Sequence, residues 1–135
     1  MTAMSDVLEN AVLDLLLRNT SLTASGINTG IFYAALFLSS PTDANSGSEI
    51  GISGTGYKRT QILGFNTANN GSTSNNTSVV FDNATADWGT VTHFGIFDSP
   101  TGGNLLFHGT LTTPKVISAG DSFVFPVGNI TISID

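Results

Sequence analysis

The sequence predicts a mainly β fold, an antiparallel and jelly-roll-like β-sandwich with one N-terminal α-helix. Apolar residues recur at helical spacing in only one segment, at about residues 5–18. From Ile31 onward, short apolar or alternating runs are separated by clusters of Gly, Asn, Ser, Thr and Pro, as in antiparallel sandwiches and barrels. With 135 residues, 40% of them hydrophobic, the chain suffices for one core and is too short for two large domains.

The N-terminal helix is predicted from apolar residues three and four positions apart, namely Val7, Leu8, Ala11, Val12, Leu15 and Leu16. Ser5 or Asp6 can cap its first turn, and Glu9 follows Asp6 by three residues as in a capping box. Because Leu13 and Leu17 widen the apolar face, we expect the helix to pack on its own β-domain or on a neighbouring subunit. The candidate residues for a contact with another chain are Val7, Leu8, Val12 and Leu15.

The same segment is unlike a signal peptide or a membrane anchor. It begins with Asp6 and Glu9 where a signal peptide has basic residues, and it is too short and interrupted to cross a bilayer. A helix lying on a membrane surface would carry basic residues opposite its apolar face, and these are missing. We therefore expect no membrane partner.

The sandwich is predicted over about residues 31–135, within a single domain of residues 1–135. The run from Ile31 to Leu38 is apolar on both alternations, so it reads as a central strand covered on both faces. In the last strand Ile130, Ile132 and Ile134 alternate with polar residues, which places the isoleucines on the core face. The remaining predicted strands lie at about residues 57–65, 78–82, 91–98, 104–111 and 122–127.

Two polar segments interrupt the strands. Residues 66–77 contain no large apolar side chain, so we expect an exposed loop or flap that contributes nothing to the core. A second polar loop is expected at residues 39–56, and tight turns at 100–103 and 119–121.

Charge and cysteine content exclude several classes of function. The formal net charge is −6, with only four Lys and Arg residues, which opposes binding to nucleic acid. The chain has no cysteine, which excludes a disulfide framework, a thiolate nucleophile and a zinc site built on sulfur. Stability must then come from packing or from association with other chains.

No catalytic or metal site can be assembled from the titratable residues. The two histidines, His93 and His108, lie in neighbouring predicted strands. If Asp98 pairs with Asn104, their imidazoles lie on opposite sides of the sheet, whereas a slip of one residue places them side by side. Two ligands make a poor metal site in either register. We predict no enzyme activity, no cofactor and no bound metal.

Three short motifs are weak candidates. Residues 43–49 carry oxygen side chains at alternate positions but lack the length and the distal Glu of a calcium loop. Residues 51–58 suggest a phosphate loop, yet Tyr57 separates Gly56 from Lys58 and a strand follows. Ser53 lacks the second Gly of a nucleophile elbow.

Trp88 has two interpretations. As a core anchor at the entrance of a strand it would be buried, which is the usual place for a large aromatic side chain. As a stacking platform for a sugar it would face solvent, with Tyr57 as the second ligand-facing ring of an adhesin.

The segments 1–6, 8–10, 85–98, 101–107, 111–115 and 120–121 carry a family resemblance, of which the stretch from Trp88 to Lys115 is the most specific. On these residues the chain resembles small bacteriophage virion proteins, commonly described as tail fibre proteins, of which some are similar to head decoration or cement proteins. The resemblance covers nearly the whole chain, departs most at residues 66–77, and implies no catalytic residue.

The resemblance implies a structural part of the virion, assembled in the host cytoplasm. A head decoration protein that clamps capsid subunits is the favoured form, because one short helix gives neither a coiled-coil nor a repetitive stalk. The alternative is a short tail fibre, knob or receptor-binding protein, whose loops would take a host glycan. The expected partners are further copies of the chain, as a homotrimer, and the major capsid protein or other virion proteins.

Overall fold

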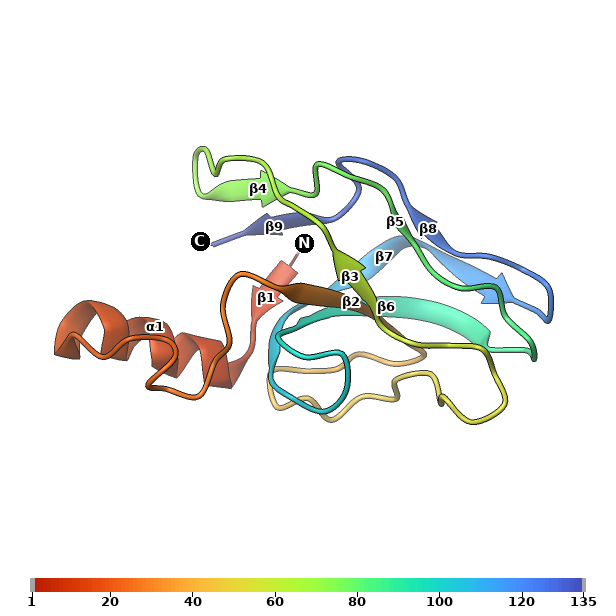
Figure 1. Ribbon diagram of the computed structural model, residues 1–135, viewed down its shortest axis with the longest axis horizontal. Helices are drawn as coiled ribbons and strands as arrows, with labels where there is room; N and C mark the ends of the chain where they lie inside the picture. The colour runs from red at the N-terminus through yellow and green to blue at the C-terminus, as the bar shows by residue number, and fades with distance from the viewer. Residues whose placement is uncertain (1, 135) are drawn as a thin grey trace.

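The structure is a computed structural model that describes residues 2–134. It forms a β-sandwich from which one helix projects (Figure 1). The elements in chain order are β1 (Thr2–Met4), α1 (Asp6–Arg18), β2 (Phe32–Phe37), β3 (Thr60–Ile62), β4 (Ser72–Ser74), β5 (Val79–Val80), β6 (Gly89–Phe97), β7 (Leu105–Ile117), β8 (Val124–Phe125) and β9 (Thr131–Ser133).

The first layer is a five-stranded antiparallel sheet in the order β1-β7-β6-β2-β3. The second layer is split into two antiparallel ladders, β4 with β9 and β5 with β8. Both ladders lie above the five-stranded sheet in Figure 1. The predicted mainly β sandwich with an N-terminal helix is confirmed, with one continuous layer and one divided layer.

The main core fills the space between the two layers. Alternate residues of β2 and β6 supply one side of it, and the segments around β5, β8 and β9 supply the other. Its aromatic members are Tyr57, Phe81, Trp88, Phe94, Phe123 and Phe125. The opposite face of β2 packs Ala35 and Phe37 against Phe97 and Leu105. Residues 34–37 are therefore buried on both faces, which confirms the prediction of a central strand.

Helix α1 begins and ends where the sequence predicts, and Ser5, one of the two predicted caps, is its N-cap. The side chain of Ser5 accepts a hydrogen bond from the backbone N–H of Leu8, and Asn19 ends the helix in a left-handed conformation with φ of 54°. With Ser5 as the cap, the third helical position is Leu8, so the capping box predicted between Asp6 and Glu9 is not formed.

The last strand is shorter than its alternation predicts. Ile130 and Ile132 are buried as expected, but Ile134 is 55% exposed, so its placement on the core face was wrong. The reason is that β9 pairs only through residues 131–133 with the short strand β4.

Residues 66–71 of the polar segment 66–77 are exposed, as expected of a loop, but residues 72–74 form β4 and hydrogen bonds hold the segment in place, contrary to the alternative of a flap. Asn70 and Gly71 both have positive φ and form a tight turn, across which Asn69 and Ser72 bond through their backbones. Asn75 is fully buried, donates to the carbonyls of Thr77 and Pro126 and accepts from the N–H of Ile130. An amide side chain therefore joins this segment to the core without any apolar residue.

Candidate contact surface

The four contact residues predicted on α1 divide into two groups. Leu8 is 6% exposed and packs with Ala11, Ile27 and Leu106, so it anchors the helix to its own sheet. Val12 is half-buried, whereas Val7 and Leu15 are 44% and 39% exposed. The helix thus attaches through its first half and leaves its second half free of the sandwich (Figure 1).

The second half of α1 is apolar on nearly every side. Leu13 is 55% exposed, Leu16 73% and Leu17 79%. The sequence interpretation counted Leu13 and Leu17 only as a widening of the apolar face and did not include Leu16 among the contact residues. The signal was present in the sequence, because a helix that is apolar all round is normally buried.

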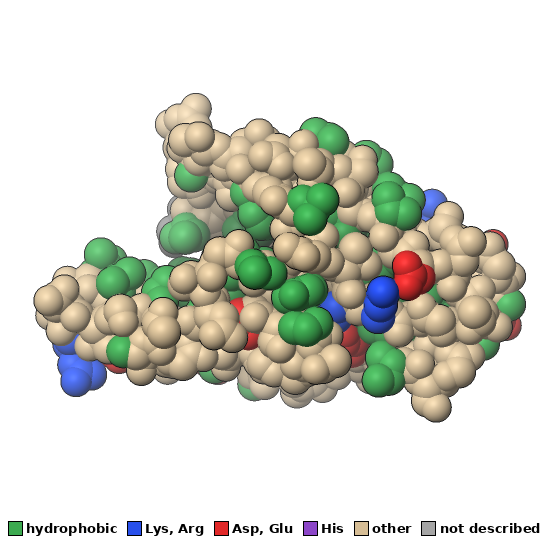
Figure 2. Space-filling model, in the orientation of Figure 1, with side chains coloured by type: hydrophobic (Ala, Val, Ile, Leu, Met, Phe, Trp, Pro, Cys, Tyr) green, Lys and Arg blue, Asp and Glu red, His purple; other side chains and the backbone are tan. Residues whose placement is uncertain are grey.

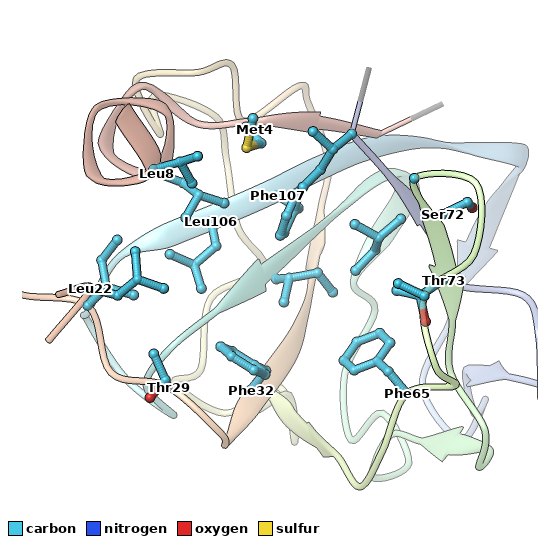
Figure 3. A pocket seen from close by; sticks show the side chains of 17 residues that line it. Met4, Leu8, Leu22, Thr29, Phe32, Phe65, Ser72, Thr73, Leu106 and Phe107 are labelled. Carbon is cyan, nitrogen blue, oxygen red and sulfur yellow. The ribbon is translucent and has the colours of Figure 1, made fainter. Parts of the chain in front are cut away.

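A groove of about 420 Å³ lies beside α1. One wall comes from Leu8 and Val12 of the helix, and the opposite wall from the turn and first residues of β4. Figure 3 shows Phe32, Phe65, Leu106 and Phe107 within it. In the space-filling view the surface is hollowed between α1 and the β4–β9 ladder, and hydrophobic side chains follow the helix (Figure 2).

The groove carries almost no polar chemistry. Thr29, Ser72 and Thr73 supply its polar side chains, and no charged side chain lines it. A ligand or partner that fits it must be apolar, because a buried charge without a partner costs far more than apolar contact gains.

Trp88 and Tyr57 lie inside the core, which contradicts the ligand-facing role that the adhesin alternative gives them. They are 4% and 3% exposed, and their rings meet edge to face with centroids 5.5 Å apart. The indole Nε1 of Trp88 donates to the carbonyl of Thr55 at 2.8 Å. Neither ring offers a face to a sugar, so Trp88 is the core anchor of the first interpretation.

Tyr57 belongs to a network centred on Glu49 and Arg59. Its hydroxyl donates to the carboxylate of Glu49 at 2.7 Å and accepts from the backbone N–H of Leu36. The guanidinium of Arg59 donates to both carboxylate oxygens of Glu49 at 2.9 Å and lies 3.5 Å from the ring centre of Phe97. Burial, and then the negative charge of Glu49, raise the pKa of the Tyr57 hydroxyl above its ordinary value.

The two histidines lie on the same face of the sheet. His93 pairs with Thr110 and His108 with Gly95, so the imidazoles are diagonal neighbours. The backbone N–H of Asp98 bonds to the carbonyl of Asn104, as the first predicted register assumes. An irregularity between Ile96 and Phe97 then shifts the pairing by one residue toward His93, which is the slip of the second predicted register. Burial, and then the nearby His108, lower the pKa of His93.

The weak motifs resolve into structural roles. Asp43 bonds to His108 at 2.7 Å while Glu49 holds Arg59, so the oxygens of residues 43–49 serve separate partners rather than one calcium ion. Residues 51–58 lead into strand β3 and not into a helix that would bind phosphate. Within residues 2–134 no cluster of three or more potential metal ligands occurs. No helix of this part is long and apolar enough to span a membrane.

Helix α1 and the groove together form an apolar contact surface at one end of the molecule. The family model of the Podophage GP4 fiber I protein gp80 matches residues 3–133. The chain belongs to this family. A search of curated proteins finds no relative with significant sequence similarity.

Membership in the fibre family makes the chain a component of a bacteriophage virion and confirms the resemblance inferred from the sequence. The matched residues include α1, the groove walls up to Ile132 and both layers of the sandwich. The family match thus covers the contact surface described above except for Ile134.

Proposed function

We propose that this chain is a non-enzymatic structural subunit of a phage tail fibre, which holds neighbouring virion proteins together through the apolar end formed by α1 and the groove. The observation that carries the proposal is the contrast between this end and the rest of the surface. Five apolar side chains are exposed on α1 alone (Val7, Leu13, Leu15, Leu16 and Leu17), whereas the other exposed large apolar side chains, which include Ile52, Leu63, Val116 and Val127, are distributed over several strands and loops. Such a patch on a folded domain marks an interaction site.

The chemistry of the remaining surface supports a role in contact rather than catalysis. Charged residues make up 10% of the chain, and short Ser, Thr and Asn side chains dominate the exposed strands and turns. Such side chains form many weak hydrogen bonds across protein contacts. The expected partners are other copies of the chain, for which the family resemblance implies a trimer, and adjoining proteins of the virion.

A second candidate is a head decoration protein that clamps the capsid surface. The compact shape favours it, because the described residues contain one helix of 13 residues and no repetitive stalk that would project a fibre. We rank the tail fibre first because the description of the family names a fibre protein.

Electron microscopy of labelled virions tests the proposal. We expect the chain on the tail of finished particles, and particles that lack it should have an otherwise intact head. Density on the head, together with a loss of heat resistance in stripped particles, would favour the decoration protein instead. Absence of the chain from finished particles would refute both candidates.

Variants of α1 test whether the contact surface is needed for incorporation of the chain into the virion. The double change Leu16→Asp and Leu17→Asp places charge on the exposed helix and should reduce incorporation into virions. Leu63→Asp is a matched control, because Leu63 is 72% exposed but lies next to the edge strand β3. Equal incorporation of both variants would contradict the role assigned to α1.

A further inference from the structure

Asn70 and Gly71 form the tight turn before β4, and this is the one place in the sequence where Asn is followed directly by Gly. In Figure 1 the turn lies at the start of β4, at the same end of the molecule as α1. We propose that Asn70 is a site of spontaneous deamidation, at which the asparagine is converted to isoaspartate without an enzyme. The inference concerns the chemistry of this turn and goes beyond the proposed function, on which it does not depend.

Asparagine is a chemically labile residue, and its side-chain amide reacts when a backbone nitrogen can reach it. The backbone nitrogen of Gly71 attacks Cγ of Asn70, so that a C–N bond forms and the bond from Cγ to the amide nitrogen breaks. The leaving amide takes up the proton of the attacking N–H and departs as ammonia, and a cyclic succinimide remains. Water then opens the ring. Cleavage at the main-chain carbonyl routes the chain through Cγ and gives isoaspartate, whereas cleavage at Cγ gives aspartate.

Both reacting groups are accessible. Asn70 and Gly71 are exposed, and within residues 2–134 neither the side-chain amide of Asn70 nor the N–H of Gly71 has a hydrogen-bond partner. Gly71 also lacks a side chain that would shield its nitrogen. Every other asparagine of the sequence is followed by a residue that has one, so the reaction is expected at Asn70 before any other position.

The turn controls the rate of the reaction. Asn70 and Gly71 have φ of 53° and 73°, and two backbone hydrogen bonds of 2.9 and 3.0 Å between Asn69 and Ser72 close the turn. This closed form restricts the rotation that brings Cγ against the Gly71 nitrogen, so the reaction proceeds from a locally opened turn. Opening requires only these bonds to break, because residues 66–71 are exposed and contribute nothing to the core.

The product changes the surface between the turn and α1. Asn70 and Glu9 line the same hollow of about 360 Å³, so the new carboxylate repels that of Glu9. Isoaspartate also lengthens the main chain of the turn by one carbon. The carbonyl of Gly71 accepts a hydrogen bond from the N–H of Ile134 at 2.8 Å, and this bond is weakened when the turn is lengthened. Gly71 lines the apolar groove as well, so the change reaches the contact surface.

Peptide mass spectrometry of the purified chain tests the site. In mildly alkaline buffer we expect the mass change from amide to acid at Asn70 before any other asparagine, with isoaspartate as the main product. In denaturant Asn70 should react roughly ten- to a hundredfold faster, because the two hydrogen bonds that close the turn are lost. Earlier deamidation at another asparagine of the folded chain, or equal rates in folded and unfolded chain, would overturn the inference.

Asn45 is a matched internal control. It is exposed and has φ of 56°, close to that of Asn70, but it is followed by Ser46. The N–H of Ser46 also donates to the carbonyl of Pro41, whereas the N–H of Gly71 has no such partner within residues 2–134. Asn45 should therefore stay intact while Asn70 is converted. Conversion of Asn45 at the same rate would mean that exposure alone, and not the Asn70–Gly71 turn, determines the site.

Hydrogen exchange measures the effect on the fold. The N–H of Ile134 should exchange roughly tenfold faster in aged than in fresh protein, because its bond to Gly71 is weakened. Asn70→Asp adds the charge without lengthening the main chain and should exchange like the fresh protein. Asn70→Ser cannot form the succinimide and should show no change on ageing. Equal exchange in fresh and fully converted wild type would refute the effect assigned to isoaspartate.

Discussion

Asp98 shows how one carboxylate fixes two loops. It is 4% exposed, accepts from the N–H of Asn104 at 2.7 Å and of Asn28 at 3.0 Å, and also binds the amide side chain of Asn104. Burial alone would raise its pKa, but these hydrogen bonds hold the pKa below the ordinary value of 3.8. The ionised carboxylate therefore closes the β6–β7 turn and ties the segment after α1 to it.

Asp98→Asn should lower the free energy of unfolding at neutral pH by about 1–3 kcal/mol, because an amide oxygen cannot accept from all three donors. The wild type should begin to lose this stabilisation as the pH falls below 3.8, the ordinary pKa of the carboxyl group. The loss is complete once the pH has passed below the lower pKa that Asp98 has in the folded chain. Urea unfolding between pH 6 and 2 measures both effects. In Asp82→Asn, a change at an exposed partner of Lys58, stability at neutral pH should stay close to wild type. Equal pH profiles for wild type and Asp98→Asn would contradict the role of Asp98.

Arg59 makes more contacts than the cation of an ordinary ion pair. Its side chain is 9% exposed, and beyond Glu49 it donates to the carbonyls of Ser99 and Gly102. It thus joins β3 to the β6–β7 turn, which an exposed pair would not do.

Arg59→Met should destabilise the chain by about 3 kcal/mol, since the carboxylate of Glu49 is left largely buried without a cation. Arg18→Met removes an exposed pair with Asp14 and should cost about 0.5 kcal/mol or less. Chemical denaturation of the two variants side by side measures the difference. Similar losses would mean that the Arg59 network contributes no more than a surface pair.

At the scale of elements, the fold could be predicted wherever apolar residues recur at the spacing of a helix or a strand. The apolar spacing of α1 and the doubly apolar run of β2 each gave the correct element. Strand β4 was missed because Ser72, Thr73 and Ser74 have no apolar face, and β1 because three residues are too few to show a period. The register of His93 was not determined because the irregularity near Ile96 leaves no mark in the sequence.

The candidate contact surface could be predicted only in part. The helical period identified α1 as a contact element, but not which of its residues face the chain's own sheet. Leu8 and Leu16 look equivalent in the sequence, yet one is 6% and the other 73% exposed. The groove could not be foreseen, because its opposite wall comes from residues 71–73, which read as a loop.

The buried amide of Asn75 joins the 66–77 segment to the core. Asn75→Ala should cost about 3 kcal/mol, because two carbonyls and one N–H lose their partner in the interior. Asn76→Ala, at the exposed neighbouring residue, should change stability by about 0.5 kcal/mol or less. Thermal unfolding of both variants gives the comparison. If Asn75→Ala were as stable as Asn76→Ala, the amide would not be what holds this segment.

At the scale of the whole molecule, a small sandwich gains stability from association. If copies pair through α1, the thermal midpoint should rise with protein concentration, by roughly 3 °C for each tenfold increase. Leu16→Asp should abolish this dependence while leaving the midpoint of the dilute protein nearly unchanged, because Leu16 contributes little to the monomer core. Calorimetry over a hundredfold range of concentration measures it, and a constant wild-type midpoint would contradict association.

The first and last strands meet beside the groove. The backbone N–H of Ser133 donates to the side chain of Thr2 at 3.0 Å, and Figure 1 marks both chain ends near β1 and β9. Ile134 also lines the groove. A tag or reporter protein fused at either end would consequently emerge next to the contact surface and compete with its partner. Labels for imaging or display are better inserted in the turn at residues 119–121, at the far end of the sandwich.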